Sequence, residues 1–435
     1  MRLELERKET FQCYLKAAEQ GNVTAQYCVG VCYDNGEGVP VNAEKAFEWF
    51  LKVAEQDDAE AQYKVGLAYD FGWGIDEDKT KAFEWYLKAA EQGDSDCQYY
   101  IGESYENGIE VTEDLAKAFE WYHKAAKQDH VKAQFKFECY SMAAAKGDAT
   151  SQFIVGMYYD NGWGVDEDKT KAFEWYLKAA EQGHVTAQFN VGVYYDNGWG
   201  VDEDKDEAFE WYRKAAEQGH VTAQFNVGVY YDNGWGVDED KDEAFEWYRK
   251  AAEQGHVTAQ FNVGVYYDNG WGVDEDQDEA FEWYLKAAEQ GHVEAQFNVG
   301  ICYGIGQGVD EDKDEAFEWY RKAAEQDHAK AQYFVGLAYD LGWGVAEDKT
   351  KAFEWYHKAA EQGHVTAQFN VGICYGIGEG VPKNLAKAFK WYLKAAEQDH
   401  AKAQYFVGVY SMDGEWQKIK LKHLIGIAKQ RNKVM

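Results

Sequence analysis

The chain has 435 residues, with 78 acidic residues against 44 lysines and arginines, so its formal net charge is −34. A surface this acidic repels phosphate, which argues against nonspecific binding to nucleic acid or anionic lipid. Its acidity favours basic proteins or peptides as partners, and the alternative is that it only keeps a long array soluble.

The sequence contains neither a membrane-span pattern nor a secretory signal. No stretch approaches the roughly 18 consecutive apolar residues that a membrane span needs. The first residues, MRLELERKETFQCY, lack the apolar segment of a signal peptide. Seven cysteines do not pair within the repeat period, so we expect packing residues in a reducing compartment, the cytoplasm. These are Cys13, Cys28, Cys32, Cys97, Cys139, Cys302 and Cys374.

A 36-residue period dominates the chain. The segment DNGWGVDEDKDEAFEWYRKAAEQGHVTAQFNVGVYY begins at Asp196 and begins again, unchanged, at Asp232. A recurring glycine marks the register in steps of 36 residues, except for one step of 54 from Gly102 to Gly156. Self-similarity at a fixed period predicts one quasi-linear array of repeats. These glycines are Gly30, Gly66, Gly102, Gly156, Gly192, Gly228, Gly264, Gly300, Gly336, Gly372 and Gly408.

The first predicted segment, residues 1–130, is an N-terminal arm of repeats. Residues 6–20 resemble the second helix of a repeat without its first helix, and Phe11 and Tyr14 are in register with the later copies. Terminal repeats of such arrays are commonly modified to cover the end of the core. We therefore expect residues 6–20 to form a capping helix.

Residues 131–148, VKAQFKFECYSMAAAKGD, interrupt the period. They start like a first helix and end like a second helix, but the glycine turn between the two is missing. We expect one fused helix and a bend between the two arms. The alternative is a deletion that two short helices accommodate.

Residues 149–414 form the predicted C-terminal arm, and the copy from His256 to Gly291 shows its logic. Ala259, Val263, Gly264 and Tyr267 share one face of a first helix. A glycine turn follows, and a second helix begins with Asp276 as its N-cap. The expected buried face of this second helix is Ala280, Trp283, Tyr284, Ala287 and Ala288. One such pair cannot bury both of its apolar faces, so neighbouring pairs must stack.

Residues 415–435 are predicted to be a basic C-terminal capping helix. Trp416, Ile419, Leu424, Ile425 and Ala428 can cover the last core face. The alternative is that this basic segment docks on the flank of another copy of the chain.

The pattern AQFxVGxxYxxGxGVxxDxxKAFEWYxKAAEQG is similar to that of the Sel-one-like repeat family, a branch of the tetratricopeptide-like solenoids. The match covers nearly the whole chain. The resemblance implies an all-α fold, a right-handed α/α superhelical solenoid of 36-residue helix–turn–helix repeats. It also implies a scaffold or adaptor for protein–protein interaction. Some secreted relatives carry a disulfide in each repeat and are linked to penicillin binding, and this chain lacks their paired cysteines.

Positions that vary between copies are candidates for binding, because core positions must be filled alike in every copy. The residue after the first turn glycine is tryptophan in six copies and glutamate, glutamine or isoleucine in others. Tryptophans beside the acids of the turn suit lysine- or arginine-rich peptides, although each could instead pack on a neighbouring turn. This predicted edge comprises Trp73, Trp163, Trp199, Trp235, Trp271 and Trp343.

A second candidate is a series of asparagines on the first helices, which line the concave groove in related solenoids. An amide both donates and accepts hydrogen bonds, so such a ladder can hold the backbone of an extended peptide. The alternative is that these side chains are simply solvated. The predicted groove residues are Asn190, Asn226, Asn262, Asn298 and Asn370.

Catalytic and metal-binding patterns are missing from the sequence. The histidines before the first helices recur one repeat apart, too far for shared metal ligation, and are assigned to linkers. The acidic turn has Glu279 where a calcium loop needs glycine. We therefore predict no enzyme activity, metal or cofactor. The predicted function is a noncatalytic scaffold for basic or extended peptides, monomeric or weakly self-associating. The alternatives are a self-associating structural array and a penicillin-interacting hydrolase.

Overall fold

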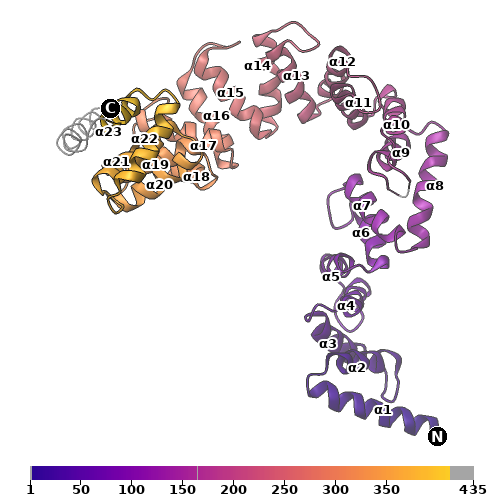
Figure 1. The fold of residues 1–435 in the computed structure, drawn as a ribbon. Coiled ribbons are helices and arrows are strands. Elements are labelled where there is room, and N and C mark those ends of the chain that lie inside the picture. Colours follow the sequence, from indigo (N-terminus) through magenta and orange to yellow (C-terminus); the bar gives the residue numbers. More distant parts are fainter. Residues whose placement is uncertain (1, 164, 412–435) are drawn as a thin grey trace. The chain divides into compact units, whose positions relative to one another are not determined.

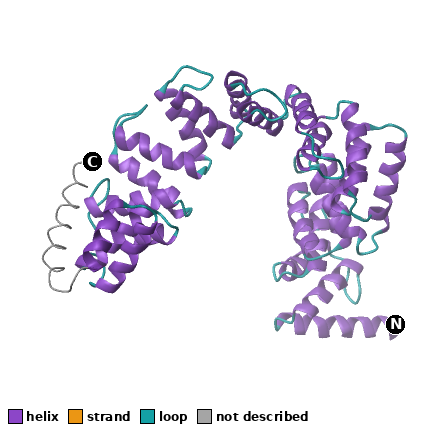
Figure 2. Ribbon diagram, turned by 45° about the horizontal axis from the view of Figure 1, so that its top comes forward, coloured by secondary structure: helices purple, strands orange, loops and turns teal. Residues whose placement is uncertain are grey.

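The computed structural model of the chain describes residues 2–163 and 165–411. Every regular element in these two stretches is an α-helix, and short loops join the helices (Figures 1 and 2). The chain divides into two compact units after Lys214, inside helix α12 (Lys205–Glu217). The predicted cap at 415–435 lies outside the described residues.

The first unit contains α1 to α11 and most of α12. Its helices are α1 (Arg2–Glu19), α2 (Val23–Asn35), α3 (Ala43–Ala54), α4 (Ala59–Phe71), α5 (Lys79–Glu91), α6 (Ser95–Asn107), α7 (Leu115–Ala126), α8 (Val131–Ala145), α9 (Ala149–Asn161), α10 (Lys169–Glu181) and α11 (Val185–Asn197).

The second unit continues the same alternation from α13 onward. Its helices are α13 (Val221–Asn233), α14 (Lys241–Glu253), α15 (Val257–Asn269), α16 (Gln277–Glu289), α17 (Val293–Ile305), α18 (Lys313–Glu325), α19 (Ala329–Leu341), α20 (Lys349–Glu361), α21 (Val365–Ile377), α22 (Leu385–Glu397) and α23 (Ala401–Ser411). Within each unit a helix packs mainly on the helices before and after it in the chain. Each unit is therefore an α/α solenoid of helix pairs, as predicted.

Local sequence sets where the helices of a pair begin and end. The first helix α15 ends at Gly270, which adopts a left-handed φ of 65° that a side chain would disfavour. The second helix α16 begins after Asp276, whose carboxylate accepts hydrogen bonds from the backbone N–H groups of Asp278 and Glu279. The predicted N-cap at Asp276 is confirmed.

The buried faces differ in two positions from the sequence prediction. On α15 the buried tyrosine is Tyr266, and the predicted Tyr267 is only half-buried. On α16 Phe281 is buried, whereas Trp283 is half-buried and packs on the core of the preceding helix pair. Helical periodicity alone does not separate adjacent aromatic positions. The difference follows from which ring faces the neighbouring pair.

Glycine on the first helix sets the spacing within each pair. A Cβ atom built on Gly228 of α13 would lie 2.6 Å from the ring of Tyr248 of α14. Real Cβ atoms do not approach carbon atoms so closely. The recurring glycine is therefore required by the tyrosine ring that lies flat against its helix.

A second glycine controls the spacing between consecutive pairs. Gly272, in the turn after α15, has a φ of 60°, and a Cβ on it would lie 2.2 Å from the carbonyl oxygen of Lys241. Lys241 belongs to the second helix of the preceding pair. The turn of one repeat thus rests directly on the backbone of its neighbour, where any side chain would separate the two.

Helix α8 replaces a pair at residues 131–148. It is one continuous helix of 15 residues, without a glycine turn. Val131, Phe135 and Met142 are 62%, 56% and 59% exposed. In a regular pair the residue equivalent to Phe135 is covered: Phe261 lies 5.7 Å from the ring of Tyr284 and 4.6 Å from that of His292. Phe135 is exposed because α8 has no second helix to cover it. The bend expected here stays a prediction.

The Gly228→Ala substitution should destabilise the protein although alanine is the better helix former. The propensity gain is about 1 kcal/mol, and forcing the Tyr248 ring away costs about 1–3 kcal/mol. We expect a lower denaturant midpoint for the full chain. The matched control is the same substitution in a Tyr248→Ala background, where the ring that the new Cβ atom would meet is absent and the gain in helix propensity remains. A midpoint shift of equal sign in both backgrounds would contradict the interpretation.

Candidate interaction site

The predicted tryptophans lie at the tips of the turns that follow the first helices. Four of them are well exposed: Trp73 by 53%, Trp199 and Trp235 by 46% each, and Trp271 by 45%. Trp163 and Trp343 are half-buried. The Trp235 ring stands edge-on to Tyr230, with the ring centroids 5.9 Å apart. One side of the indole therefore packs on its own repeat and the remainder faces solvent.

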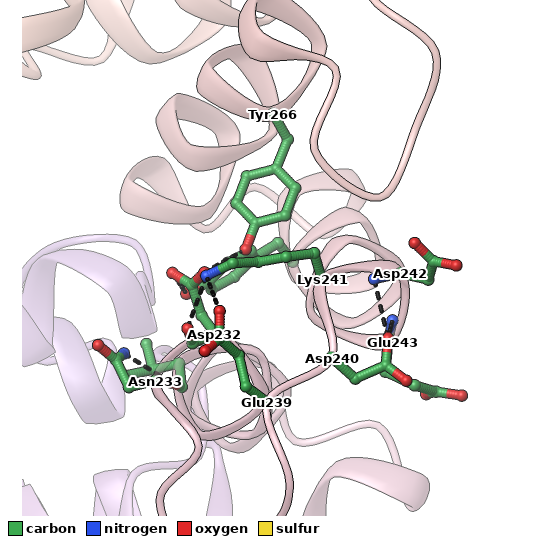
Figure 3. A network of polar contacts seen from close by, with 10 residues as sticks. Asp232, Asn233, Glu239, Asp240, Lys241, Asp242, Glu243 and Tyr266 are labelled. Atoms are coloured by element: carbon green, nitrogen blue, oxygen red, sulfur yellow. Dashed lines mark hydrogen bonds and ion pairs between the residues drawn. The ribbon is translucent and has the colours of Figure 1, made fainter.

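The three acids of each turn have different partners, as the turn before α14 shows. Asp240 caps α14, where it accepts from the backbone N–H groups of Asp242 and Glu243 (Figure 3). Glu239 lies 3.1 Å from the Nζ atom of Lys241. Asp238 is exposed and has no hydrogen-bond or ion-pair partner among the described residues. The same holds for Asp76, Asp202 and Asp274, which also lie three residues after an exposed tryptophan.

The predicted asparagines are less accessible than the tryptophans. Four are half-buried, and Asn370 is only 6% exposed. Asn190, Asn262, Asn298 and Asn370 hydrogen-bond the hydroxyl of a tyrosine on the preceding helix, which works against the raised pKa of that tyrosine. Part of each amide is thus used inside the solenoid.

A half-buried carboxylate network, which the sequence analysis did not identify, joins consecutive pairs (Figure 3). Asp232, at the end of α13, accepts hydrogen bonds from Lys241 and Tyr248 of α14, over 2.6 and 3.2 Å. It also accepts one from Tyr266 of α15, over 2.5 Å. Since Tyr266 belongs to the next pair, one aspartate binds three helices together. We call this set the carboxylate network.

The carboxylate network recurs along the chain. The aspartate accepts from the second-helix tyrosine of its own repeat over 3.1–3.3 Å in six copies. These aspartates are Asp70, Asp160, Asp196, Asp232, Asp268 and Asp340.

At the interruption Glu106 takes the place of the aspartate. It accepts from Tyr122 of α7 and from Lys136 and Tyr140 of α8. Helix α8 therefore preserves the network although it lacks a partner helix.

Electrostatics in the network favour the ionised pair. Burial lowers the pKa of Lys241, but hydrogen bonds to Asp232 and Glu239 outweigh it and hold that pKa above its ordinary value. Burial raises the pKa of Glu106, and the hydrogen bonds from Lys136, Tyr122 and Tyr140 outweigh it, so its pKa is lowered. Burial, together with the nearby carboxylate, raises the pKa of Tyr266. The Glu106 carboxylate therefore stays charged and Tyr266 stays protonated at neutral pH.

A ladder of glutamines also crosses between repeats. Gln224, 6% exposed, donates to the carbonyl oxygen of Ala216 over 3.2 Å and accepts from Gln254 over 2.7 Å. The equivalent bond recurs in most copies, for example from Gln290 to Gln260. The chain thus has a buried amide ladder built from glutamine. Its signal in the sequence is the same invariance that marks core positions.

The repeated histidines are helix N-caps rather than plain linkers. The Nδ1 atom of His256 accepts a hydrogen bond from the backbone N–H of Ala259 over 3.2 Å, and its ring stacks on Phe225 at 4.5 Å. The neutral ring is needed, because a protonated Nδ1 cannot accept. Burial lowers the pKa of seven of these histidines. They are His184, His220, His256, His292, His328, His364 and His400.

Metal ligation and membrane insertion find no support in the described part of the chain. No group of three or more histidine, cysteine or acidic side chains is arranged to hold a metal ion there. No described helix combines the length and the apolar character needed to cross a bilayer. All seven cysteines are free thiols, and burial raises the pKa of Cys302 to about 11.

Comparison with known proteins identifies the family of the chain. A model of the Sel1 repeat matches eleven segments, so the protein belongs to the Sel1 repeat family. The matches omit the α8 segment, in agreement with its irregular sequence. The matched segments are 7–22, 23–58, 59–94, 95–130, 149–184, 185–220, 221–256, 257–292, 293–328, 329–364 and 365–400.

Two solved structures are similar over most of the chain. One is c5321, a protective antigen present in uropathogenic Escherichia coli strains and displaying an SLR fold. It is 34% identical, the match covers 96% of this chain and 85% of that one, and the TM-score is 0.55. The other is a Sel1 repeat protein from Oxalobacter formigenes, 30% identical over 75% of this chain and 90% of that one, with a TM-score of 0.50. No curated protein matches the chain.

The Asp232→Ala substitution should destabilise the protein markedly. It leaves the buried hydroxyls of Tyr248 and Tyr266 without their carboxylate acceptor and removes one of the two carboxylates that pair with Lys241, which costs about 1–3 kcal/mol of unfolding free energy. The measurement is the denaturant midpoint of the full chain. Asp238→Ala, in the same turn but exposed and without a partner, should change the unfolding free energy by less than about 0.5 kcal/mol. Equal effects of the two substitutions would rule out a structural role for the network.

The histidine caps should make stability fall in mild acid. Their folded pKa values lie below the ordinary value of 6.5, so the unfolded chain binds more protons as the pH falls below that value. The free energy of unfolding must then decrease between about pH 7 and pH 5. Replacing His256 and His292 by asparagine, the cap that the chain itself uses at Asn22, should reduce the drop in melting temperature over this range. An unchanged drop would show that other groups cause it.

Proposed function

We propose that this protein is a noncatalytic scaffold that binds basic or extended segments of other proteins. Its main surface is the edge formed by the exposed tryptophans and the unpaired aspartates that follow them. The observation that carries the proposal is that each exposed tryptophan lies three residues before an exposed acid with no structural partner. The other acids of the turn cap a helix or neutralise a lysine.

Chemistry at this edge matches lysine and arginine side chains. A cation gains from an indole face by cation–π attraction and from a nearby carboxylate by Coulomb attraction. The chain itself contains ten pairs in which a lysine Nζ lies 3.4–4.3 Å from a tryptophan ring centroid. Those tryptophans belong to the second helices. The turn tryptophans present the same ring to solvent.

The asparagine ladder is proposed as a secondary contact for the backbone of an extended segment. Four of its members are half-buried, so a fraction of each amide remains accessible. The absence of catalysis is part of the proposal, because the carboxylates of the described chain recur periodically along the repeats and no set of reactive groups among the described residues stands apart from them. A cytoplasmic, monomeric or weakly self-associating protein is consistent with this role. Membership of a family whose repeats typically serve protein–protein interaction supports it.

Binding of a lysine- and arginine-rich peptide tests the proposal. Trp235→Gln with Trp271→Gln uses the residue found at this position in another copy, Gln307, and should weaken binding about tenfold, roughly 1.4 kcal/mol. Asp238→Asn with Asp274→Asn should also weaken it. Isothermal titration at two salt concentrations measures both effects.

The matched control is Glu282→Gln with Glu289→Gln, which removes the same charge from exposed positions of α16 away from the turns. If this pair weakens binding as much as the aspartate pair, attraction is a general effect of net charge and the edge is not a site. Mass measurements by light scattering without peptide detect the alternative, a self-associating array.

A further inference from the structure

One repeat has lost half of the carboxylate network. In the copy that contains α17 and α18, Gly304 stands where Asp268 stands one repeat earlier. Ala338 of α19 stands where Tyr266 would donate to the aspartate. The two donors from α18, Lys313 and Tyr320, are still present. This copy therefore lacks both the carboxylate acceptor and one of the two tyrosine rings of the network.

These deletions coincide with a cavity of about 350 Å³. Gly304, Lys313, Tyr320 and Ala338 line it. Its aromatic walls are Phe317, Phe334 and Trp343. A cavity with one polar end and an aromatic remainder has the composition typical of sites for small organic groups.

Tyr320 points at the position of the missing carboxylate. Its hydroxyl lies 3.3 Å from the place that a Cβ atom on Gly304 would occupy. The residue is 8% exposed, and no described residue forms a hydrogen bond with the hydroxyl. Its O–H group is therefore available to an acceptor that enters the cavity.

Lys313 supplies the positive charge. Its side chain is 54% exposed, and its one ion-pair partner among the described residues is Glu311, at 3.2 Å, which also lines the cavity. Lys241, which has its aspartate, is 36% exposed. The Nζ atom of Lys313 also lies 6.0 Å from the ring centroid of Trp343. The ammonium is therefore at the cavity, with no aspartate to receive it.

We propose that this cavity binds a carboxylate attached to an aromatic or apolar group. The carboxylate takes the position of the missing aspartate and accepts from Lys313 and Tyr320, as Asp232 accepts from Lys241 and Tyr248. The attached ring fills the space that Ala338 leaves between Phe334 and Trp343. The source is either a free aryl carboxylic acid or an acidic residue next to an aromatic one in a partner protein.

A second glycine in the chain shows what the site requires. Gly376 also replaces the aspartate, but Leu385 stands at the lysine position there. A carboxylate at that point would meet no cation. Among the described copies, the copy at Gly304 alone lacks the aspartate and keeps the lysine, Lys313. This site lies apart from the four exposed tryptophans of the edge, although Trp343 of the same series lines it.

The test uses the full chain and 4-hydroxyphenylacetate as probe, with ligand-observed NMR and isothermal titration. We expect saturable binding of this acid and no binding of the neutral analogue 4-hydroxyphenethyl alcohol. Lys313→Gln should weaken binding at least about tenfold. Lys351→Gln is the matched control, because Lys351 is also 54% exposed and lies outside the cavity; it should leave binding unchanged.

A variant that restores the network, Gly304→Asp with Ala338→Tyr, should fill the cavity, abolish binding and raise the melting temperature. The melting temperature confirms that this variant is folded. Acetylated peptides ending in Tyr-Asp distinguish the two sources: binding by the peptide or by the free acid supports the site. Binding of the alcohol as tight as that of the acid, retained binding by the filled variant, or no binding of either carboxylate would overturn the proposal.

Discussion

The solenoid depends on the contact between a glycine of each first helix and the tyrosine ring of the second helix. At 2.6 Å from a hypothetical Cβ, the ring of Tyr248 leaves no room for a side chain at Gly228. This contact fixes how closely the two helices approach. It also directs the tyrosine hydroxyl toward Asp232 at the end of the first helix. The aspartate then reaches Tyr266 of the following pair. The close packing of glycine and tyrosine within one pair thus positions the aspartate that hydrogen-bonds the next pair.

Most polar groups of the repeats are paired within the structure, and a few exposed ones have no partner among the described residues. Buried glutamines bond to one another and to the backbone, histidines cap helices, and two of the three turn acids have structural partners. What remains exposed without a partner is a tryptophan followed by an aspartate, repeated along the turns. The copy at Gly304 shows the reverse case: the donors Lys313 and Tyr320 are present, but the aspartate that would accept from them is missing. The proposed edge and the proposed cavity are thus both places where the pattern of internal pairing is incomplete.

Much of the fold follows from the sequence alone. The period, the helix pairs, the N-cap at Asp276 and the terminating glycines all depend on local chemistry that one repeat contains. The assignments that failed depend on the neighbouring repeat. Whether Tyr266 or Tyr267 is buried, and whether Phe281 or Trp283 is, is decided by contacts with other helices, such as those of Phe245 with both tyrosines.

The candidate site was predicted only in part, for a related reason. Comparing copies correctly singles out variable positions, and the exposed tryptophans are among them. The same comparison treats invariant positions as core and so passes over Asp232 and Lys241. Their constant spacing of nine residues, with a tyrosine sixteen residues after the aspartate, was the available signal. The loss of that aspartate at Gly304 is informative only once the network is known.

The carboxylate network has a consequence for how such a chain changes in length. Two consecutive copies, beginning at Asp196 and Asp232, are identical over 36 residues. The two copies therefore present the same side chains to the repeat that follows each of them. A whole 36-residue block can therefore be gained or lost by recombination between these copies, and the joint that results is one the protein already contains. The proposed tryptophan edge can therefore become longer or shorter by one block at a time, and no new contact between repeats is needed.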